Sequence, residues 1–268
     1  MKRALLVVFA LFSSFGYAAG TSIVPIHELA LGQSMVGGHL LNDSVFSNPA
    51  SAVFTNVYSI DGTYFGGGGF STSVLDTKTS SVGGGAGFYR MASAVPGKFN
   101  QGLRLALMSK LTPNIGWGLA GKILWGENVP GQEKNIKDLD LGLLFDYTVI
   151  QFGATVRNIF GGDPSYLEQS RELGVGARIN YEQVLFLSLA AYSRFDKFVP
   201  YQLSVGAEYV SPYYFSLRGG FRARPEEQKS FWTAGLGVSS GKFGIHYAVE
   251  FPNQSANTQH LLNMDVML

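Results

Sequence analysis

Segments of about ten residues in which apolar and polar side chains alternate occupy most of this chain, and they restrict its fold more than any other feature. In residues 138–147, for example, leucine, phenylalanine and tyrosine stand at every second position, between aspartate, glycine and leucine. Successive side chains of a β-strand point to opposite faces, so such a segment is a strand with one apolar face. After residue 18, no apolar run approaches the length of about 20 residues that a transmembrane helix needs. The apolar faces are therefore covered either by a second sheet or by lipid.

We predict about fourteen strands, joined by connections that are alternately tight and long. The strands are expected at residues 57–65, 70–77, 81–92, 101–110, 114–126, 136–147, 149–158, 171–180, 183–193, 200–210, 212–222, 229–239, 242–250 and 258–268. The connections near 180–182 and at Ser211 are tight. Those near 126–135 and 159–170 are long. Outer-membrane barrels have short periplasmic turns and longer outer loops, so the predicted fold class is all-β, a transmembrane antiparallel β-barrel over residues 54–268.

The composition favours a barrel in lipid over a secreted β-sandwich, which would also alternate. Charged residues make up 15% of the chain, against about 25% in a typical soluble domain. A sandwich of fourteen strands needs more charge on its outer faces than this. Aromatic residues, 13% of the chain, stand near both ends of the predicted outward faces. That distribution is typical of the aromatic girdles at the two membrane interfaces.

The first 18 residues have the features of a secretory signal peptide. Lys2 and Arg3 precede an apolar run over residues 4–12, and the small residues Gly16 and Ala18 follow at cleavage spacing. We expect cleavage after Ala18 and residence in the outer membrane of a Gram-negative-type cell. Loss of the two basic residues leaves 18 basic and 19 acidic ones, so no basic excess attracts nucleic acid. The chain has no cysteine, which excludes disulfides, thiolate zinc sites and a lipid-modified N-terminal cysteine.

Residues 19–53 lack the alternation and carry a different pattern. Glycines at positions 32, 37 and 38 precede the pair Asn42-Asp43, and Asn48-Pro49-Ala50 leads into the first predicted strand. This stretch resembles the N-terminus of the FadL-like family of outer-membrane fatty-acid transporters, and equally that of the related PorV-type proteins. The resemblance implies that residues 19–53 lie in the lumen as a hatch or plug. The hatch residues that it identifies are Gly37, Gly38, Asn42, Asp43, Asn48, Pro49 and Ala50.

A barrel of this width has room for such a segment. Fourteen strands enclose a wider lumen than the eight-stranded barrels that side chains alone can fill. Glycines on the predicted lumen face leave further space. They are Gly116, Gly118, Gly174, Gly176, Gly206, Gly235 and Gly237. Pro49 restricts Asn48 to extended conformations, which suits a fixed turn before the barrel wall.

The third predicted strand contains a run of glycines, Gly83, Gly84, Gly85 and Gly87. The resemblance implies that this run could be a kink that opens a lateral gap in the wall. From the residues alone, the run is equally a weakened strand that makes space for the hatch. Both interpretations stay open at this point.

The predicted lumen face carries balanced charges. The charges singled out are Arg104, Lys122, Asp138, Asp140, Arg157, Arg178, Glu208, Arg218 and Glu250. The balance suggests internal salt bridges that tie the hatch to the wall, and no ion-selective pore. In a water-exposed lumen, the replacement Asp140→Asn is expected to do little.

The sequence offers no catalytic or metal-binding motif. The four histidines, His27, His39, His246 and His260, show no metal-ligand spacing. An outer-membrane phospholipase would need a serine beside a histidine at the lipid face, whereas His246 falls on the inward set. We therefore expect no metal, no cofactor and no enzymatic activity.

The leading functional prediction, by resemblance, is passive transport of hydrophobic or amphipathic small molecules across the outer membrane. Its partners would be outer-membrane lipid and a hydrophobic ligand resembling a long-chain fatty acid. The alternative is a PorV-type secretion or surface-assembly component that binds partner proteins. This chain is shorter than typical fatty-acid transporters and lacks their long outer loops, which favours the alternative somewhat. A general diffusion barrel is a third possibility.

Overall fold

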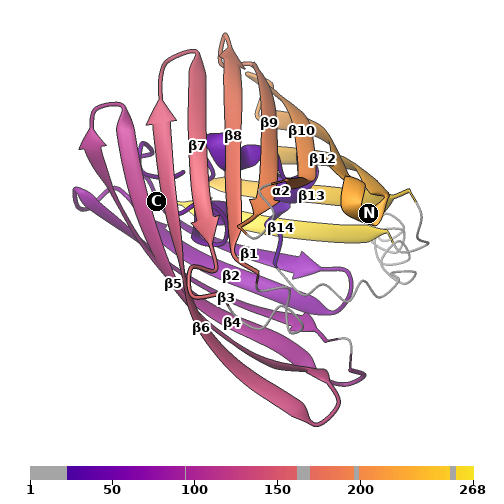
Figure 1. The fold of residues 1–268 in the computed structure, drawn as a ribbon. Coiled ribbons are helices and arrows are strands. Elements are labelled where there is room, and N and C mark those ends of the chain that lie inside the picture. Colours follow the sequence, from indigo (N-terminus) through magenta and orange to yellow (C-terminus); the bar gives the residue numbers. More distant parts are fainter. Residues whose placement is uncertain (1–22, 94, 162–169, 196–198, 254–257) are drawn as a thin grey trace, which may run out of the picture.

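Fourteen antiparallel strands form a closed barrel in the computed structural model, which describes residues 23–93, 95–161, 170–195, 199–253 and 258–268 (Figure 1). The strands are β1 (Tyr58–Phe65), β2 (Gly69–Asp76), β3 (Val82–Ala92), β4 (Phe99–Thr112), β5 (Ile115–Val129), β6 (Gln132–Asp146), β7 (Ile150–Arg157), β8 (Glu172–Tyr181), β9 (Leu185–Arg194), β10 (Pro200–Val210), β11 (Phe215–Arg224), β12 (Lys229–Ser239), β13 (Phe243–Pro252) and β14 (Gln259–Met267). Each strand pairs with its neighbours in sequence, and β14 pairs with β1. The predicted fold class and strand number are confirmed.

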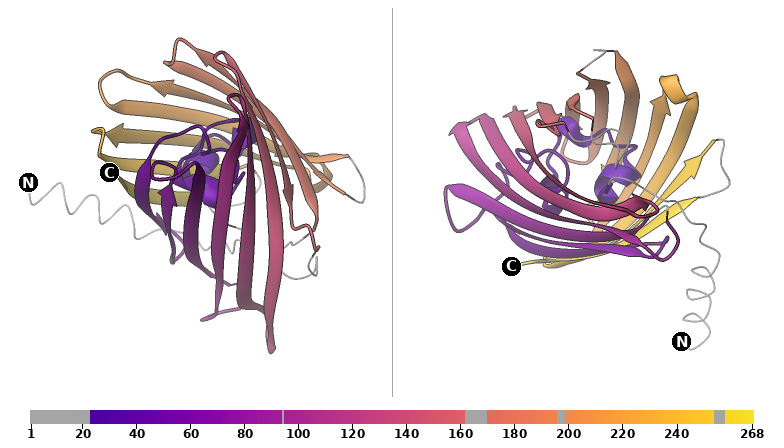
Figure 2. Two further views of the ribbon diagram at one scale, coloured as in Figure 1. Left: turned by 90° about the vertical axis from the view of Figure 1, so that its left-hand side faces the viewer. Right: turned by 60° about the horizontal axis from the view of Figure 1, so that its bottom comes forward.

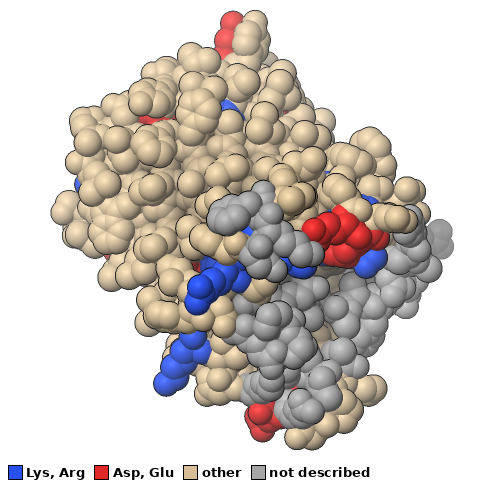
Figure 3. Space-filling model, in the orientation of Figure 1, with Lys and Arg blue, Asp and Glu red and all other residues tan. Residues whose placement is uncertain are grey.

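The alternation in the sequence places apolar side chains on the outside of the barrel. In β4, Leu103, Leu105 and Leu107 are 37%, 59% and 54% exposed, whereas the intervening Ala106 and Met108 are 2% and 0% exposed. Figure 3 shows a broad uncharged surface over β7 to β10, with charged residues gathered near strand ends. An outward apolar face without charges suits contact with lipid acyl chains.

Two predicted connections are wrong in extent. The connection expected at 126–135 is mostly strand, because β5 continues to Val129 and β6 begins at Gln132, around a tight turn at Gly131 (φ 78°). The pairing shifts register between Glu127 and Val129. The sequence of this extension is rich in charged and amide residues and shows no apolar alternation, so the alternation pattern did not predict a strand there. The two strands continue to pair in a region where neither needs an apolar face. The turn expected at Ser211 is longer than predicted, because β11 starts only at Phe215.

The segment before β1 lies inside the barrel (Figure 2). It contains the short helix α2 (Ile26–Ala30) and the 3-10 turns η1 (Met35–Gly37) and η2 (Asn42–Val45); a third 3-10 turn, η3 (Pro225–Glu227), joins β11 and β12. Most residues from 23 to 53 are buried. In the described part of the chain, no helix is long and apolar enough to cross a membrane. The predicted signal peptide and residues 19–22 lie outside the described residues.

Candidate functional site

Glycines of the wall bring the backbone of the N-terminal segment directly against the lumen face. A Cβ atom built on Gly118 would lie 2.4 Å from the Pro49 carbonyl oxygen, and one built on Gly153 would lie 1.9 Å from the Val36 oxygen. A Cβ atom would lie within 2.7 Å of the segment at Gly85, Gly87, Gly116, Gly118, Gly142, Gly153, Gly206, Gly220 and Gly235. These glycines belong to β3, β5–β7 and β10–β12, so the segment is seated against a large part of the wall. Any side chain at these positions would push it inward.

Some glycines have roles that the sequence did not separate. Gly174 and Gly237 face the wall side chains of Tyr192 and His246 instead of the segment. Gly142, Gly153 and Gly220 were not singled out, although their alternation with outward residues was visible in the sequence. Parity along a strand can identify a lumen-facing glycine, but it does not tell which neighbour will fill the space above it.

Of the proposed hatch glycines, Gly37 makes the closest contact with the wall. A Cβ atom on Gly37 would lie 2.6 Å from the Gly176 oxygen, so the backbones of η1 and β8 touch. A Cβ atom on Gly38 would instead meet the flexible ends of Met35 and Arg178. The first position requires glycine for a backbone-to-backbone contact, whereas the second could yield by movement of side chains.

Asn48, Pro49 and Ala50 form a turn that is fixed to the wall. The Asn48 amide donates to the Val36 carbonyl at 2.9 Å and to the Leu143 carbonyl of β6 at 3.3 Å. Its side-chain oxygen accepts the Ala50 N–H at 3.0 Å, which is an Asx-type turn. Val36, Asn48 and Ala50 are fully buried. Asn48 therefore links two parts of the segment to β6 through a single side chain.

Asn42 and Asp43 bond on different sides of η2. The Asn42 amide donates to the Ser73 hydroxyl at 3.0 Å, and its oxygen accepts from the Ser59 hydroxyl, which ties η2 to β1 and β2. The Asp43 carboxylate accepts from the His27 backbone N–H at 2.9 Å and contacts the His27 ring at 3.2 Å. Asp43 thus closes the segment on itself, while Asn42 anchors it to the wall.

Asp140 is the centre of a buried ion network. Its carboxylate lies 2.5 Å from the Lys122 ammonium and 3.3 Å from the Arg104 guanidinium, and it is fully buried. It also accepts the Asn158 N–H at 2.8 Å, where the chain leaves the β6–β7 ladder with a φ of 57°. Arg104 in turn donates to the Phe46 carbonyl at 2.7 Å. The expectation that Asp140 is exposed to water in the lumen is wrong, because Lys122, Arg104 and the backbone of Asn158 enclose its carboxylate.

The other predicted lumen charges are also paired, mostly between strands. The Glu208 carboxylate forms ion pairs with the guanidinium groups of Arg178 at 2.7 Å and Arg218 at 2.8 Å. The Glu250 carboxylate forms one with the Arg222 guanidinium at 2.7 Å. Asp138 instead accepts the Phe160 N–H at 3.0 Å, just beyond the end of β7. These contacts cross from strand to strand, so they stiffen the wall more than they tie it to the segment.

Arg157 is linked to the segment through Ser47. Its guanidinium donates to the Ser47 hydroxyl at 3.2 Å, and that hydroxyl bonds to the Glu28 carboxylate of α2. Burial raises the pKa of the Glu28 carboxyl, while the nearby Arg157 and the Ser47 bond act in the opposite direction. Arg104 on β4 and Arg157 on β7 therefore bond to the segment through a backbone carbonyl and a hydroxyl, and not through the predicted salt bridges.

An apolar patch on the lumen face is the feature that sequence reasoning missed. Phe65, Tyr89, Met91, Leu124 and Leu261 all point inward, are buried, and lie toward the outer half of the barrel if β1 runs outward. The segment covers the patch with apolar side chains of its own, namely Ile23, Ile26, Leu29, Val45 and Phe46. Strand parity places these wall residues on the lumen face, so their apolar character was a usable signal. Barrel interiors are otherwise polar.

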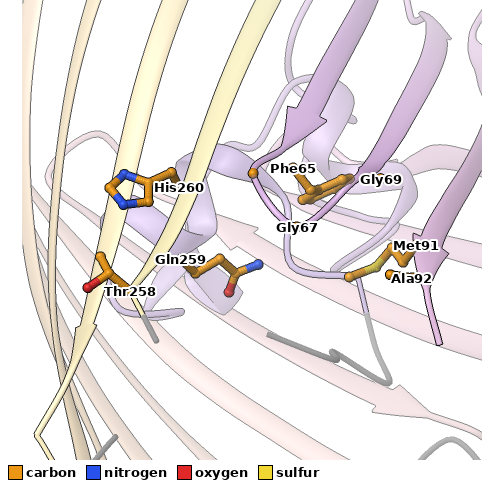
Figure 4. Close-up of a pocket in the computed structure, with 9 residues that line it drawn as sticks. Phe65, Gly67, Gly69, Met91, Ala92, Thr258, Gln259 and His260 are labelled. Atoms are coloured by element: carbon orange, nitrogen blue, oxygen red, sulfur yellow. The ribbon is translucent and has the colours of Figure 1, made fainter. Parts of the chain in front are cut away.

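A pocket opens onto this patch at the end of the barrel. Phe65 and Met91 belong to both, and the β1–β2 turn and the start of β14 complete the lining (Figure 4). In Figure 4, Gln259 and His260 of β14 stand on one side, and Met91 of β3 stands on the other. The open space is about 20 Å³, which is room for one or two water molecules. A larger guest would need the flexible Met91 side chain to move.

The glycine run of β3 is paired with β4 throughout and with β2 from Gly84 onward. Gly84, Gly85 and Gly87 pair with β2 and β4 without a register shift. On the lumen side, Cβ atoms at Gly85 and Gly87 would lie 2.7 Å from Val45 and 2.5 Å from Phe46. The run therefore makes room for the segment. A lateral opening would require these ladders to separate, and it stays a prediction.

The histidines do not form a metal site among the residues that the structure describes. In that part of the chain no group of three or more histidine, cysteine, aspartate or glutamate residues could hold a metal ion. His27 and His246 lie edge to face with ring centroids 4.7 Å apart, and both line a cavity together with Ser239 and Met267. His39 reaches Asp146 at 3.2 Å.

No protein-family model and no curated protein sequence matches this chain. Solved structures do match its fold. The CymD monoaromatic hydrocarbon channel aligns with a TM-score of 0.65 and 8% identity, over 94% of this chain and 98% of that chain. The Pseudomonas putida toluene transporter TodX aligns with a TM-score of 0.63 and 12% identity, over 92% and 97%.

A Pseudomonas aeruginosa FadL homologue aligns with a TM-score of 0.61 and 11% identity, over 92% of this chain and 99% of that chain. At such identities the likeness concerns the fold alone. The chain therefore has the fold of FadL-like outer-membrane barrels.

Proposed function

We propose that this protein is an outer-membrane channel that admits small hydrophobic or amphipathic molecules through the apolar pocket at the outer end of its lumen. The supporting observation is the inward-facing apolar patch of Phe65, Tyr89, Met91, Leu124 and Leu261, in a lumen that also contains ion pairs such as Arg178–Glu208 and Arg222–Glu250. Ligand pockets are typically apolar with a few polar groups, here Gln259 and His260. The fold is shared with proteins described as toluene and hydrocarbon channels. Export would use residues 1–18 as a cleaved signal peptide.

In this proposal the N-terminal segment acts as a hatch. It fills the lumen between the outer pocket and an inner cavity of about 450 Å³ beside Phe54, Met108 and Lys110. The wall keeps its own hydrogen bonds without it, so the segment can move while the barrel stays closed. The contacts of Asn42, Asn48 and Arg104 would hold it in the sealed state.

Binding to the patch is tested with two variants at one position. Purified protein in detergent is titrated with toluene and with decanoate, with glucose as the negative control. Met91→Asp places a charge in the patch and should abolish binding of both apolar probes, because burying an unpaired charge is costly. Met91→Leu conserves volume and should bind like the unmodified protein. Equal binding by both variants would remove the patch from the proposal. A protein partner that co-purifies in fixed ratio, with no apolar ligand bound, would favour the secretion alternative.

For the exit of the ligand we propose a lateral route at Gly83–Gly87. Within β3 this stretch carries no side chain larger than that of Ala86, and Val45 and Phe46 behind it continue the apolar patch. Ala86 pairs with Val74 of β2 and with Leu105 of β4. Since the chain has no cysteine, disulfides between Cys pairs placed at 74 and 86, or at 86 and 105, would lock either ladder. Oxidation should stop toluene entry into liposomes, and reduction should restore it. If toluene enters the liposomes equally well with either disulfide formed, the ligand would have to leave past the segment into the inner cavity instead.

A further inference from the structure

A further cavity lies at the inner end of the lumen, away from the apolar patch and separate from the cavity beside Phe54, Met108 and Lys110. Its volume is about 140 Å³, enough for several waters or for a short alkyl chain. The segment contributes His27 and Asp43 to its lining, and the wall contributes Asp61, Asn263 and Asp265. Ser239 and Met267, the last residues of β12 and β14, place it at the end of the barrel with the tight turns, which is the periplasmic end in outer-membrane barrels.

Two carboxylates of this cavity stand opposite each other without a cation. Asp61 of β1 and Asp265 of β14 are direct cross-strand partners, and like charges in that relation destabilise a sheet. Asp61 accepts hydrogen bonds from Ser73 at 2.5 Å and from Asn263 at 3.1 Å, both of which are neutral. Both aspartates are more than nine-tenths buried.

The neighbouring cationic groups are engaged elsewhere. Arg218 donates to Glu208 at 2.8 Å, a carboxylate that it shares with Arg178. Its NH1 also lies 3.4 Å from His246 Nδ1. A guanidinium only donates, so Nδ1 accepts and the His246 proton is on Nε2, which donates to Asp265 at 2.8 Å. His246 is then neutral and does not balance the charge of Asp265.

Two of the lining residues each have a buried acceptor without a partner in the described part of the chain, Oδ2 of Asp265 and Oδ1 of Asn263. The Asn263 amide nitrogen is fixed by Asp61 and by Thr63, at 2.8 Å from the latter, so the amide cannot turn to supply a donor instead. The wall also makes room for the Asp265 carboxylate, since a Cβ atom at Gly244 would lie 2.3 Å from its oxygen. Buried acceptors of this kind require a donor.

We propose that this cavity binds a primary ammonium group. An ammonium supplies three donors and one positive charge, which matches two unpartnered acceptors beside an uncompensated pair of carboxylates. The described residues offer no grouping suited to a metal ion, and the cavity volume accommodates the alkyl chain of an amine. The group could come from a soluble periplasmic amine or from a lysine side chain of a periplasmic polypeptide. This inference is independent of the apolar ligand at the outer end.

The test uses the full-length assembled protein in detergent and isothermal titration calorimetry. Butylammonium should bind saturably at one site, whereas tetramethylammonium, which has the same charge and no N–H donor, and sodium should not. Nα-acetyl-lysine methylamide distinguishes the two sources of the ammonium group. If it binds, the site takes a lysine side chain; if it does not bind while butylammonium does, the site takes a free amine. Equal binding of butylammonium and tetramethylammonium, or no saturable binding of any amine, would overturn the proposal.

Variants locate the site. Asp265→Asn and Asn263→Leu should each weaken butylammonium binding about ten- to hundredfold, since each removes a hydrogen bond to a charged group. The control is Asp76→Asn, an exposed carboxylate near the same end of the barrel that bonds only to its own turn in the described contacts. Heat-modifiable migration in gels confirms assembly of each variant. Unchanged affinity in assembled Asp265→Asn protein would place the bound amine elsewhere, and the proposal would fail.

Discussion

The contact between Gly153 and the N-terminal segment allows a sharp test of how the lumen is filled. In Gly153→Ala, the new methyl group would lie 1.9 Å from the Val36 oxygen, 2.7 Å from the Val36 carbon and 2.8 Å from the Gly37 Cα. Non-bonded atoms prefer separations of about 3.5–4.0 Å, so η1 must move away from β7 by more than an ångström. The obstructing atoms are backbone, which no change of rotamer can relieve.

Gly121→Ala is the matched control. Gly121 lies in β5 on the outward face, and a Cβ atom there would meet nothing nearer than Leu139 at 3.7 Å. Replacing glycine by alanine in a strand should stabilise by about 0.5–1 kcal/mol, because alanine loses less backbone entropy on folding. At Gly153 the same gain is opposed by overpacking, which typically costs about 1–3 kcal/mol. The two substitutions are therefore expected to change stability in opposite directions.

The assay has two readouts. Thermal unfolding followed by heat-modifiable gel migration should show a lower midpoint for Gly153→Ala and an equal or higher one for Gly121→Ala. Single-channel conductance in planar bilayers should rise for Gly153→Ala alone, because displacement of η1 loosens the filling of the lumen while the wall ladder stays intact. Equal behaviour of the two variants in both measurements would refute the packing of segment 23–53 against the wall.

Three further predictions concern the wall. Leu143→Arg places a charge on the outward face and should cost about 2–4 kcal/mol near the bilayer midplane, seen as loss of assembled barrel in vesicle refolding, whereas Leu143→Ile should assemble normally. Asp140→Asn should destabilise by about 3–5 kcal/mol in urea titrations, because Lys122 and Arg104 lose their buried partner; a change below 1 kcal/mol would contradict the network. Cysteines placed singly at Glu133 and Glu182, at opposite ends of the barrel, should label from outside intact cells at 133 only, and labelling at 182 alone would invert the orientation.

The sequence by itself determined the wall of this protein. Alternation with period two is a local property of the strand, and a one-residue slip would turn every apolar face inward. The fourteen strands could therefore be read from residues such as Leu103, Leu105 and Leu107 without knowledge of their neighbours. Strand ends outside the apolar zone, as at Val129 and Gln132, were misjudged because no burial requirement marks them.

Only the tertiary structure decided what fills the lumen. The alternation along each strand shows that Gly153 and Asp140 face inward. It does not show that Val36 packs against Gly153, or that Lys122 and Arg104 both bond to Asp140. Gly153 and Val36 are more than a hundred positions apart in the sequence, and Asp140, Lys122 and Arg104 come from three different strands. The pairing of Asp61 with Asp265 likewise exists only because the barrel closes β14 onto β1. Closure brings the two ends of the chain together, and no local pattern in the sequence encodes which side chains then meet.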